Sequence, residues 1–152
     1  MAQRSRLSTG LSGIAGEYFV AAELSRRGYI ASLTLRNTKG IDILASNTDA
    51  TKSVGIQVKA NQKHGKDWML NQKVESDIAT NLFFVFIRLN NLDAPDYYIV
   101  PRAEVARYAK DNHQQWLKTP GRKDQVHQDT PIRKFADPEN KYLGRWELLD
   151  LD

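Results

Sequence analysis

The sequence contains no cysteine, which excludes a disulfide framework, a thiolate nucleophile and a zinc site built from thiolates. It also lacks any apolar run of the roughly 20 residues that a membrane-spanning helix needs. The basic start MAQRSRLSTG is followed by no apolar run of signal-peptide length. Internal repeats, low-complexity tracts and Gly/Ser linkers are missing as well. We therefore expect a cytoplasmic protein with no membrane partner.

The charge of the chain is modest and unevenly divided. Residues 1–76 hold 11 Lys and Arg against 6 Asp and Glu, whereas residues 77–152 hold 11 against 12. The basic first half could meet a phosphate backbone, although an ordinary solvated surface explains the imbalance equally well. A chain of 152 residues is most simply one domain, 1–152, because this length buries about two-thirds of its unfolded surface without staples.

The hydrophobic pattern predicts an α/β fold, a mixed sheet with helices packed on it. Residues 11–27 are typical of an amphipathic helix, and a second helix is expected from Pro101 to about residue 117. Strands are expected at 29–35, 41–46, 54–60, 82–89 and 97–100, and residues 68–80 could form a short strand and then a short helix. This core spans about 11–117. Residues 118–152 are expected to be an irregular extension that closes with a short strand near 146–149.

Two acidic residues occupy positions where apolar residues are expected. On a helical wheel Glu17 falls inside the apolar arc of the first helix. In the stretch GIDILAS, Asp42 is the only acid of a strand that is apolar on either side of it. An ionised carboxylate in such surroundings is costly unless a cation or hydrogen-bond donors meet it. Each residue therefore has an internal partner or points at a site.

The stretch GIQVKA, residues 55–60, places an amide and an amine on one face of a strand. Apolar residues alternate there with Gln57 and Lys59. If the 47–52 loop pairs this strand with the preceding one, Asp42 can share that face. Two carboxylates and an amide oxygen suit Mg²⁺. A lysine beside the ion could orient or deprotonate water, or stabilise charge on a phosphate.

The order of these motifs resembles the PD-(D/E)XK nuclease superfamily, most closely archaeal Holliday-junction resolvases and Mrr-type restriction endonucleases with a QxK variant. The motifs are Glu17 in a helix, Gly40-Ile41-Asp42 on a strand and Gln57-Val58-Lys59 on the next strand. The likeness covers about residues 11–100. It implies a restriction-endonuclease-like αβββαβ core and a metal-dependent endonuclease that hydrolyses phosphodiester bonds in DNA, such as branched or foreign DNA.

The resemblance also implies roles for individual residues. The catalytic residues would be Glu17, Asp42, Gln57 and Lys59. The ion, Mg²⁺ with Mn²⁺ as a substitute, would be held by Glu17, Asp42, Gln57 and the backbone carbonyl of Val58. Ile41 replaces the proline of the family name, which does no chemistry. Gln57 replaces the second acid and removes one negative charge from the metal site, as in the QxK version of the Mrr-like branch.

Two basic segments are candidates for contact with phosphates. The first is the turn just before Asp42, and the second is the polar loop 61–67; their candidate residues are Arg36, Asn37, Thr38, Lys39, Lys63 and Lys66. The alternative is that both segments are ordinary solvated loops. The isolated histidines are expected at the surface, and the larger aromatic residues in the core; the residues concerned are His64, His113, His127, Trp68, Phe83, Phe84, Phe86 and Trp146.

Plainer explanations exist for each candidate. Glu17 could be tied to a buried arginine, Asp42 could brace the RNTKG turn, and Lys59 could reach solvent past its neighbours. Three functions therefore compete: a metal-dependent endonuclease, a non-catalytic nucleic-acid-binding protein of the same fold, and a structural or interaction module. The loss of charge at Gln57 is the main support for the second. Cutting two strands would favour a two-fold homodimer.

Overall fold

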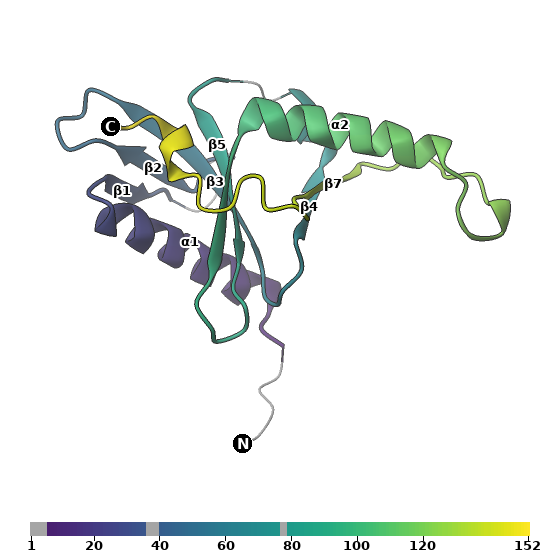
Figure 1. Ribbon diagram of the computed structural model, residues 1–152, viewed down its shortest axis with the longest axis horizontal. Helices are drawn as coiled ribbons and strands as arrows, with labels where there is room; N and C mark the ends of the chain where they lie inside the picture. Colours follow the sequence, from purple (N-terminus) through teal and green to yellow (C-terminus); the bar gives the residue numbers. More distant parts are fainter. Residues whose placement is uncertain (1–5, 36–39, 77–78) are drawn as a thin grey trace, which may run out of the picture.

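A computed structural model describes residues 6–35, 40–76 and 79–152. Within these residues a five-stranded sheet has the order β1-β2-β3-β5-β6 (Figure 1). β1, β2 and β3 form an antiparallel meander, β3 pairs with β5 in parallel, and β6 returns antiparallel to β5. The strands are Ile30–Leu33, Ile43–Ser46, Ser53–Asn61, Leu82–Arg88 and Asp96–Pro101. The mixed sheet flanked by helices, expected of a restriction-endonuclease-like fold, is confirmed.

The first helix, α1 (Thr9–Arg26), approaches the sheet with small residues rather than large ones. Ser8 caps its start by accepting the N–H of Leu11 at 3.2 Å. Its buried residues repeat every fourth position, at Ser12, Gly16, Val20 and Leu24. A Cβ at Gly16 would lie 3.0 Å from the Cβ of Ala60 and 3.1 Å from Ile87, so any larger residue would have to push these neighbours away.

The apolar arc predicted for α1 is therefore partly wrong. It included Leu11 and Tyr18, which are 57% and 61% exposed. The helix is rotated so that the stripe of Ser12 and Gly16 faces the sheet, because the short distance between helix and sheet leaves no room there for large side chains. Glu17 stays half-buried beside that stripe.

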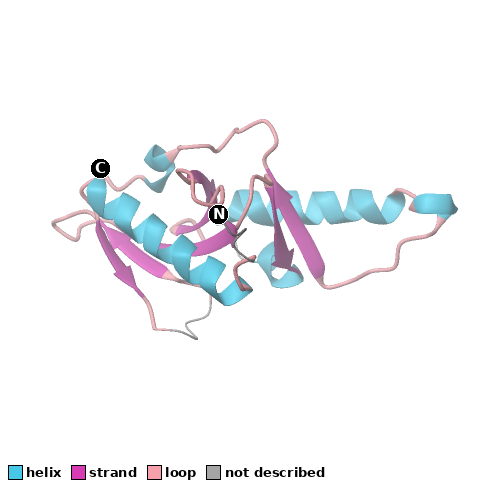
Figure 2. Cartoon of the chain, turned by 90° about the horizontal axis from the view of Figure 1, so that it is seen from below, coloured by secondary structure: helices cyan, strands magenta, loops and turns pink. Residues whose placement is uncertain are grey.

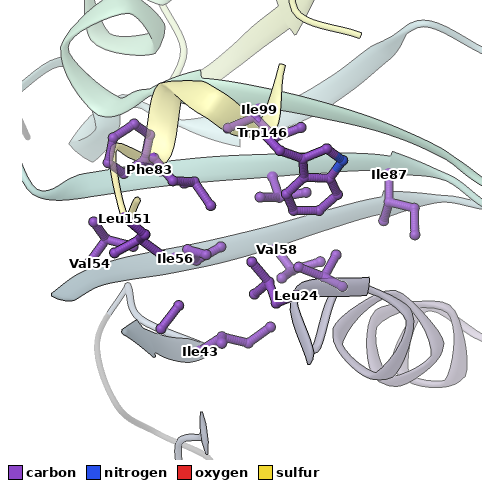
Figure 3. Packing of buried hydrophobic residues seen from close by; sticks show 14 of the residues in the cluster. Leu24, Ile43, Val54, Ile56, Val58, Phe83, Ile87, Ile99, Trp146 and Leu151 are labelled. Atoms are coloured by element: carbon purple, nitrogen blue, oxygen red, sulfur yellow. The ribbon is translucent and has the colours of Figure 1, made fainter. Parts of the chain in front are cut away.

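The face of the sheet under α1 carries an apolar core. Val54, Ile56 and Val58 of β3 point into it together with Leu24 of α1 (Figure 3). The C-terminal segment closes the same core through Trp146, at the start of the 3₁₀ helix η3 (Trp146–Leu149), with Leu149 and Leu151. A short strand was expected at 146–149. That expectation is wrong, because Trp146 and Leu149 are three residues apart and reach one core from a helical turn.

The opposite face is covered by α2 (Arg102–Lys118) and by a two-stranded ribbon of β4 (Asp67–Asn71) and β7 (Ile132–Ala136). Its core is rich in aromatic side chains. Phe86 stacks on Phe135 with ring centroids 4.5 Å apart, and Trp68 lies 5.1 Å from Phe86. The C-terminal part of α2 and the loop after it extend away from the five-stranded sheet (Figures 1 and 2). The aromatic residues predicted for the core are all buried.

The short strand and short helix expected at 68–80 are confirmed as β4 and η1 (Gln72–Ser76), and the helix is of the 3₁₀ type. One further expectation needs correction. The extension 118–152 is not wholly irregular, since it contains η2 (Arg122–Asp124) and β7. The pairing that creates β7 is long-range, with Trp68 opposite Phe135.

His113 is not a surface residue. It is buried on α2, its Nε2 lies 2.7 Å from Asp129, and its ring lies 5.5 Å from that of Trp116. The ring of His127 also stacks on Trp116, with ring centroids 4.0 Å apart. These contacts attach the loop after α2 to the helix. None of the described helices is long and apolar enough to cross a bilayer.

Candidate functional site

Strand β3 separates its apolar and polar side chains as the sequence predicts. Ile56 and Val58 belong to the core under α1, whereas Gln57 and Lys59 are half-buried on the other face. There Gln57 is paired with Phe84 of β5, and Lys59 with Phe86. The two polar side chains therefore lie along one face of the sheet, beside an aromatic core.

Asp42 lies next to β3 at the start of β2. Its N–H donates to the carbonyl of Ile56 at 2.8 Å, and its Oδ2 accepts the N–H of Val58 at 2.7 Å. The N–H and C=O of one strand residue point to the same side of the strand. The carbonyl of Val58 is thus directed to the edge where the Asp42 carboxylate lies. The ladder of β2 and β3 reaches Ile43↔Ile56, so no described strand pairs with β3 on this side beyond Asp42.

Arg102, the first residue of α2, is the main member of the site that the sequence analysis missed. It is 4% exposed, and its Nη2 donates to Oε1 of Gln57 at 2.9 Å and to the carbonyl of Gly40. Its guanidinium lies 4.7 Å from the ring centroid of Phe84. Burial lowers the pKa of Arg102 and the charge of Asp42 raises it, but an arginine keeps its proton under any ordinary condition.

Two sequence signals pointed to Arg102. It lies on the buried stripe of α2 with Val105, Ala106 and Ala109, where an arginine is as unexpected as Glu17 on α1. It also places a cation at a helix N-terminus, which the helix dipole disfavours. Arg102 also explains the glycine two residues before Asp42. Gly40 has φ of +68°, and a Cβ there would lie 3.2 Å from the Arg102 guanidinium.

Gln57 and Lys59 open into a pocket of about 380 Å³. Arg102, Gly40 and Lys73 of η1 also line it. The remaining lining residues are Leu70, Asn71, Val74 and Phe84. The described lining residues include three cations and no acidic side chain. Asp42 is absent from the lining, but its carboxylate is close enough to raise the pKa of Arg102.

Glu17 approaches the same part of β3 from the opposite face. Gly16, the preceding residue, packs against Val58 and Ala60, so this turn of α1 lies at the level of Gln57 to Lys59. Glu17 itself is half-buried. That Glu17, Asp42, Gln57 and Lys59 share one cavity stays a prediction.

The candidate phosphate contacts are only partly within the described residues. The turn with Arg36, Asn37, Thr38 and Lys39 lies outside them. Lys63 is exposed, whereas Lys66 is half-buried with its Nζ 3.4 Å from the carbonyl of Pro138. Their contact with DNA stays a prediction.

The donor set at the open edge of β3 consists of oxygen atoms. A carboxylate (Asp42), a carbonyl (Val58) and an amide oxygen (Gln57) are the ligand types that Mg²⁺ accepts. Histidine and cysteine ligands, typical of zinc, are absent from this part of the described chain. No group of three or more Asp, Glu or His that could hold an ion occurs within residues 6–35, 40–76 and 79–152. The donors therefore suit a weakly held, partly hydrated hard cation.

No protein-family model matches the chain, and no curated protein matches it in sequence. Among solved structures, one similar chain is Hjc, a Holliday junction resolvase from the archaeal hyperthermophile Archaeoglobus fulgidus. The similarity covers 82% of this chain and 84% of that chain, with 14% sequence identity and a TM-score of 0.49.

Proposed function

We propose that the protein is a metal-dependent endonuclease that hydrolyses phosphodiester bonds in DNA, with branched or foreign DNA as its substrate. One observation carries the proposal. The Asp42 carboxylate is bonded to the backbone of Val58 at the open edge of β3, and the residues on either side of Val58 point an amide and an amine into a cationic pocket. A phosphate needs both features, oxygen ligands for a cation and positive charge for its own oxygens.

In this proposal Asp42 and the Val58 carbonyl hold Mg²⁺ or Mn²⁺, with Gln57 and Glu17 as further oxygen donors. When bound, the ion polarises the scissile phosphate and lowers the pKa of a coordinated water. The Asp42 carboxylate is kept in place by the N–H of Val58, which fixes its direction before any ligand binds. Lys59 binds a phosphate oxygen or orients the attacking water.

Arg102 has a positioning role. Its hydrogen bond to Oε1 fixes the orientation of the Gln57 amide and leaves the second lone pair of that oxygen for a cation. Arg102 is itself fixed by Gly40 and Phe84, so little of its conformational freedom remains to be lost during the reaction.

The same contact favours a second candidate, a non-catalytic nucleic-acid-binding protein. The guanidinium occupies one lone pair of Gln57 and places a positive charge beside the proposed metal ligand, while Gln57 contributes no charge in return. Both effects weaken binding of a divalent cation. Phosphate binding would remain, because it needs only the cations of the pocket.

A nicking assay distinguishes the two functions. Supercoiled plasmid and a synthetic four-way junction are incubated with the wild type, with Asp42→Ala and with Lys110→Ala, an exposed α2 residue outside the pocket, in Mg²⁺, Mn²⁺ or EDTA. We expect cleavage by the wild type and by Lys110→Ala that EDTA abolishes, and none by Asp42→Ala. Equal cleavage by all three variants would indicate a different site, and no cleavage at any metal concentration would leave the binding protein.

A further inference from the structure

The pocket beside β3 extends well beyond the residues that the proposed reaction uses. Part of its lining comes from η1 and from the end of β4, neither of which contributes to the proposed metal ligands. Its size is at the small end of the range for small-molecule sites, which suits a phosphate group with part of its sugar. This part of the pocket is therefore lined by residues that the proposed metal does not use.

Two cations besides Lys59 line this pocket, and neither is itself a proposed metal ligand. Arg102 is almost fully buried and is fixed by Gln57, Gly40 and Phe84, so it presents a positive charge with a defined position. It begins α2, a 17-residue helix, and therefore adds its charge to the positive end of the helix dipole. A fixed cation at a helix N-terminus is an arrangement that binds phosphate.

Lys73 provides the second charge from η1. Its N–H donates to Oδ1 of Asn71 at 3.1 Å, which fixes the turn at the start of η1. Its side chain is exposed and takes part in no ion pair within the described residues. Charged side chains on a surface are often paired, and nearby Glu75 is bonded to Arg133 at 2.5 Å. Among the described residues, therefore, the acid of η1 is paired with Arg133 and not with Lys73.

We propose that Arg102 and Lys73 form a phosphate subsite, separate from the scissile position at Asp42 and Lys59. This inference rests on the proposed function in one respect, that the ligand is part of a nucleic acid; the phosphate chemistry itself does not depend on cleavage. The phosphate is either a neighbouring diester of the bound strand or the terminal monoester of a strand end. Both have the oxygen atoms and negative charge that the two cations and the helix N-terminus bind.

The first experiment uses inorganic phosphate as the probe, in EDTA, so that no metal contributes. ¹⁵N-labelled protein is titrated with phosphate at constant ionic strength, and amide shifts are followed for the wild type, for Lys73→Glu and for Lys110→Glu as a charge-matched control. We expect saturable shifts at Gly40, Lys73 and Arg102, and about tenfold weaker binding in Lys73→Glu alone. Identical titrations of all three proteins, or shifts confined to Lys59, would overturn the subsite.

The second experiment identifies the source of the phosphate. Single-stranded oligonucleotides with a 5′-hydroxyl, a 5′-phosphate or a 3′-phosphate are titrated in EDTA by fluorescence anisotropy over a range of salt concentrations. A diester ligand gives equal affinities for the three strands, and a terminal ligand gives a preference for one of them. The slope of log affinity against log salt concentration is negative. In either case Lys73→Gln should reduce its magnitude by about one, whereas Lys110→Gln should not. An unchanged slope in Lys73→Gln contradicts the proposal.

The same variants separate this inference from the proposed nuclease. Lys73→Gln should raise the KM for DNA cleavage about tenfold and leave kcat within a few-fold, because a remote phosphate contact contributes to binding in the ground state and transition state alike. Phosphate binding at Lys73 without any cleavage by the wild type would refute the nuclease and retain the subsite. DNA cleavage that Lys73→Gln leaves unchanged would retain the nuclease and refute the subsite.

Discussion

The two faces of the central sheet differ in how their helices cover β3. α1 packs directly against β3 and β1, and the face beneath it is an apolar core. α2 packs mainly against η1 and β7, and its first residue, Arg102, reaches Gln57 of β3 on the other face. Gln57 and Lys59 line a pocket there, and Arg102 forms part of its wall. One strand therefore stabilises the fold with its even-numbered residues and offers polar groups with its odd-numbered ones.

The candidate site therefore lies where the polar face of β3 borders a pocket rather than a closely packed helix. A polar side chain at residue 57 or 59 would be costly beneath a helix, because burial without a partner removes it from water. Under the start of α2 it meets a pocket, an arginine and solvent instead. We expect substitutions on the two faces of β3 to separate stability from function, and the following predictions run from the largest effect to the smallest.

Ile56→Ala should be the most destabilising change on β3. Ile56 is fully buried beneath α1, and truncation of such a side chain costs about 2–5 kcal/mol through lost burial and a residual cavity. Urea unfolding followed by circular dichroism measures the change. Gln57→Ala, on the next residue but the other face, should cost far less. Equal losses would mean that the polar face contributes as much to the fold as the apolar one.

Gln57→Glu should raise the affinity for Mg²⁺ or Mn²⁺ about tenfold, because it adds a carboxylate to a donor set in which Gln57 contributes no charge. Part of the gain is offset by pairing of the new carboxylate with Arg102, which now donates to Oε1 of Gln57. Isothermal titration with Mn²⁺ measures the effect, and Gln115→Glu on exposed α2 is the matched control. An affinity unchanged by Gln57→Glu would remove Gln57 from the metal site.

Gly16→Ala and Gly13→Ala should have opposite effects on stability. Both glycines lie in α1, where alanine is favoured over glycine by about 1 kcal/mol. A Cβ at Gly13 meets nothing within 4 Å, so this change should stabilise the protein by about that amount. At Gly16 the new methyl group would press on Ala60 and Ile87, and we expect a net loss of about 1 kcal/mol. Thermal unfolding of both variants tests the close approach, which a gain in both would refute.

Acid should weaken the polar network that joins β5 to β6. Burial raises the pKa of Asp96, but hydrogen bonds from Asn90 at 2.9 Å and Arg88 at 2.6 Å, with the charge of Arg88, lower it below its ordinary 3.8. The folded-state pKa is therefore below the unfolded one. Ionised Asp96 stabilises the fold above about pH 3.8, and this contribution is lost as the pH falls through the folded pKa.

The measurement is the melting temperature of the wild type and of Asp96→Asn between pH 6 and pH 2.5. The advantage of the wild type should be constant above pH 5 and should shrink below pH 4. A difference that is independent of pH would mean that the charge of Asp96 makes no contribution.

The sequence was sufficient to predict which side chains of β3 face the core, but not how the residues around β3 are arranged. Alternation along GIQVKA depends on the strand alone, so the faces of Ile56, Gln57 and Lys59 could be predicted. The rotation of α1 could not be derived from hydrophobicity, because Ser12 and Gly16 face the sheet for reasons of space. A helical wheel gives most weight to large apolar residues, so it predicted that Leu11 faces the core.

Other failures come from long-range pairing. β7 has the buried pattern Arg133, Phe135, in which a charged residue occupies an inward position and is satisfied by Glu75, 58 residues away in the sequence. No local pattern reveals such a partner. Arg102 lies on the buried stripe of α2, which is a signal in the sequence, but its partners Gln57 and Gly40 are 45 and 62 residues away and no local pattern reveals them.

Lys59→Ala tests most directly whether the polar face of β3 is a catalytic site. Three quantities are measured for this variant and the wild type: the free energy of unfolding in urea, DNA affinity by anisotropy in Ca²⁺ or EDTA, and the nicking rate in Mg²⁺. We expect the first two to change little and the rate to fall by roughly 10² or more, the scale of losing one positioned acid–base or electrostatic group. A rate that stays within a few-fold of the wild type, or a fall in rate matched by an equal loss of affinity, would contradict a catalytic role for this face.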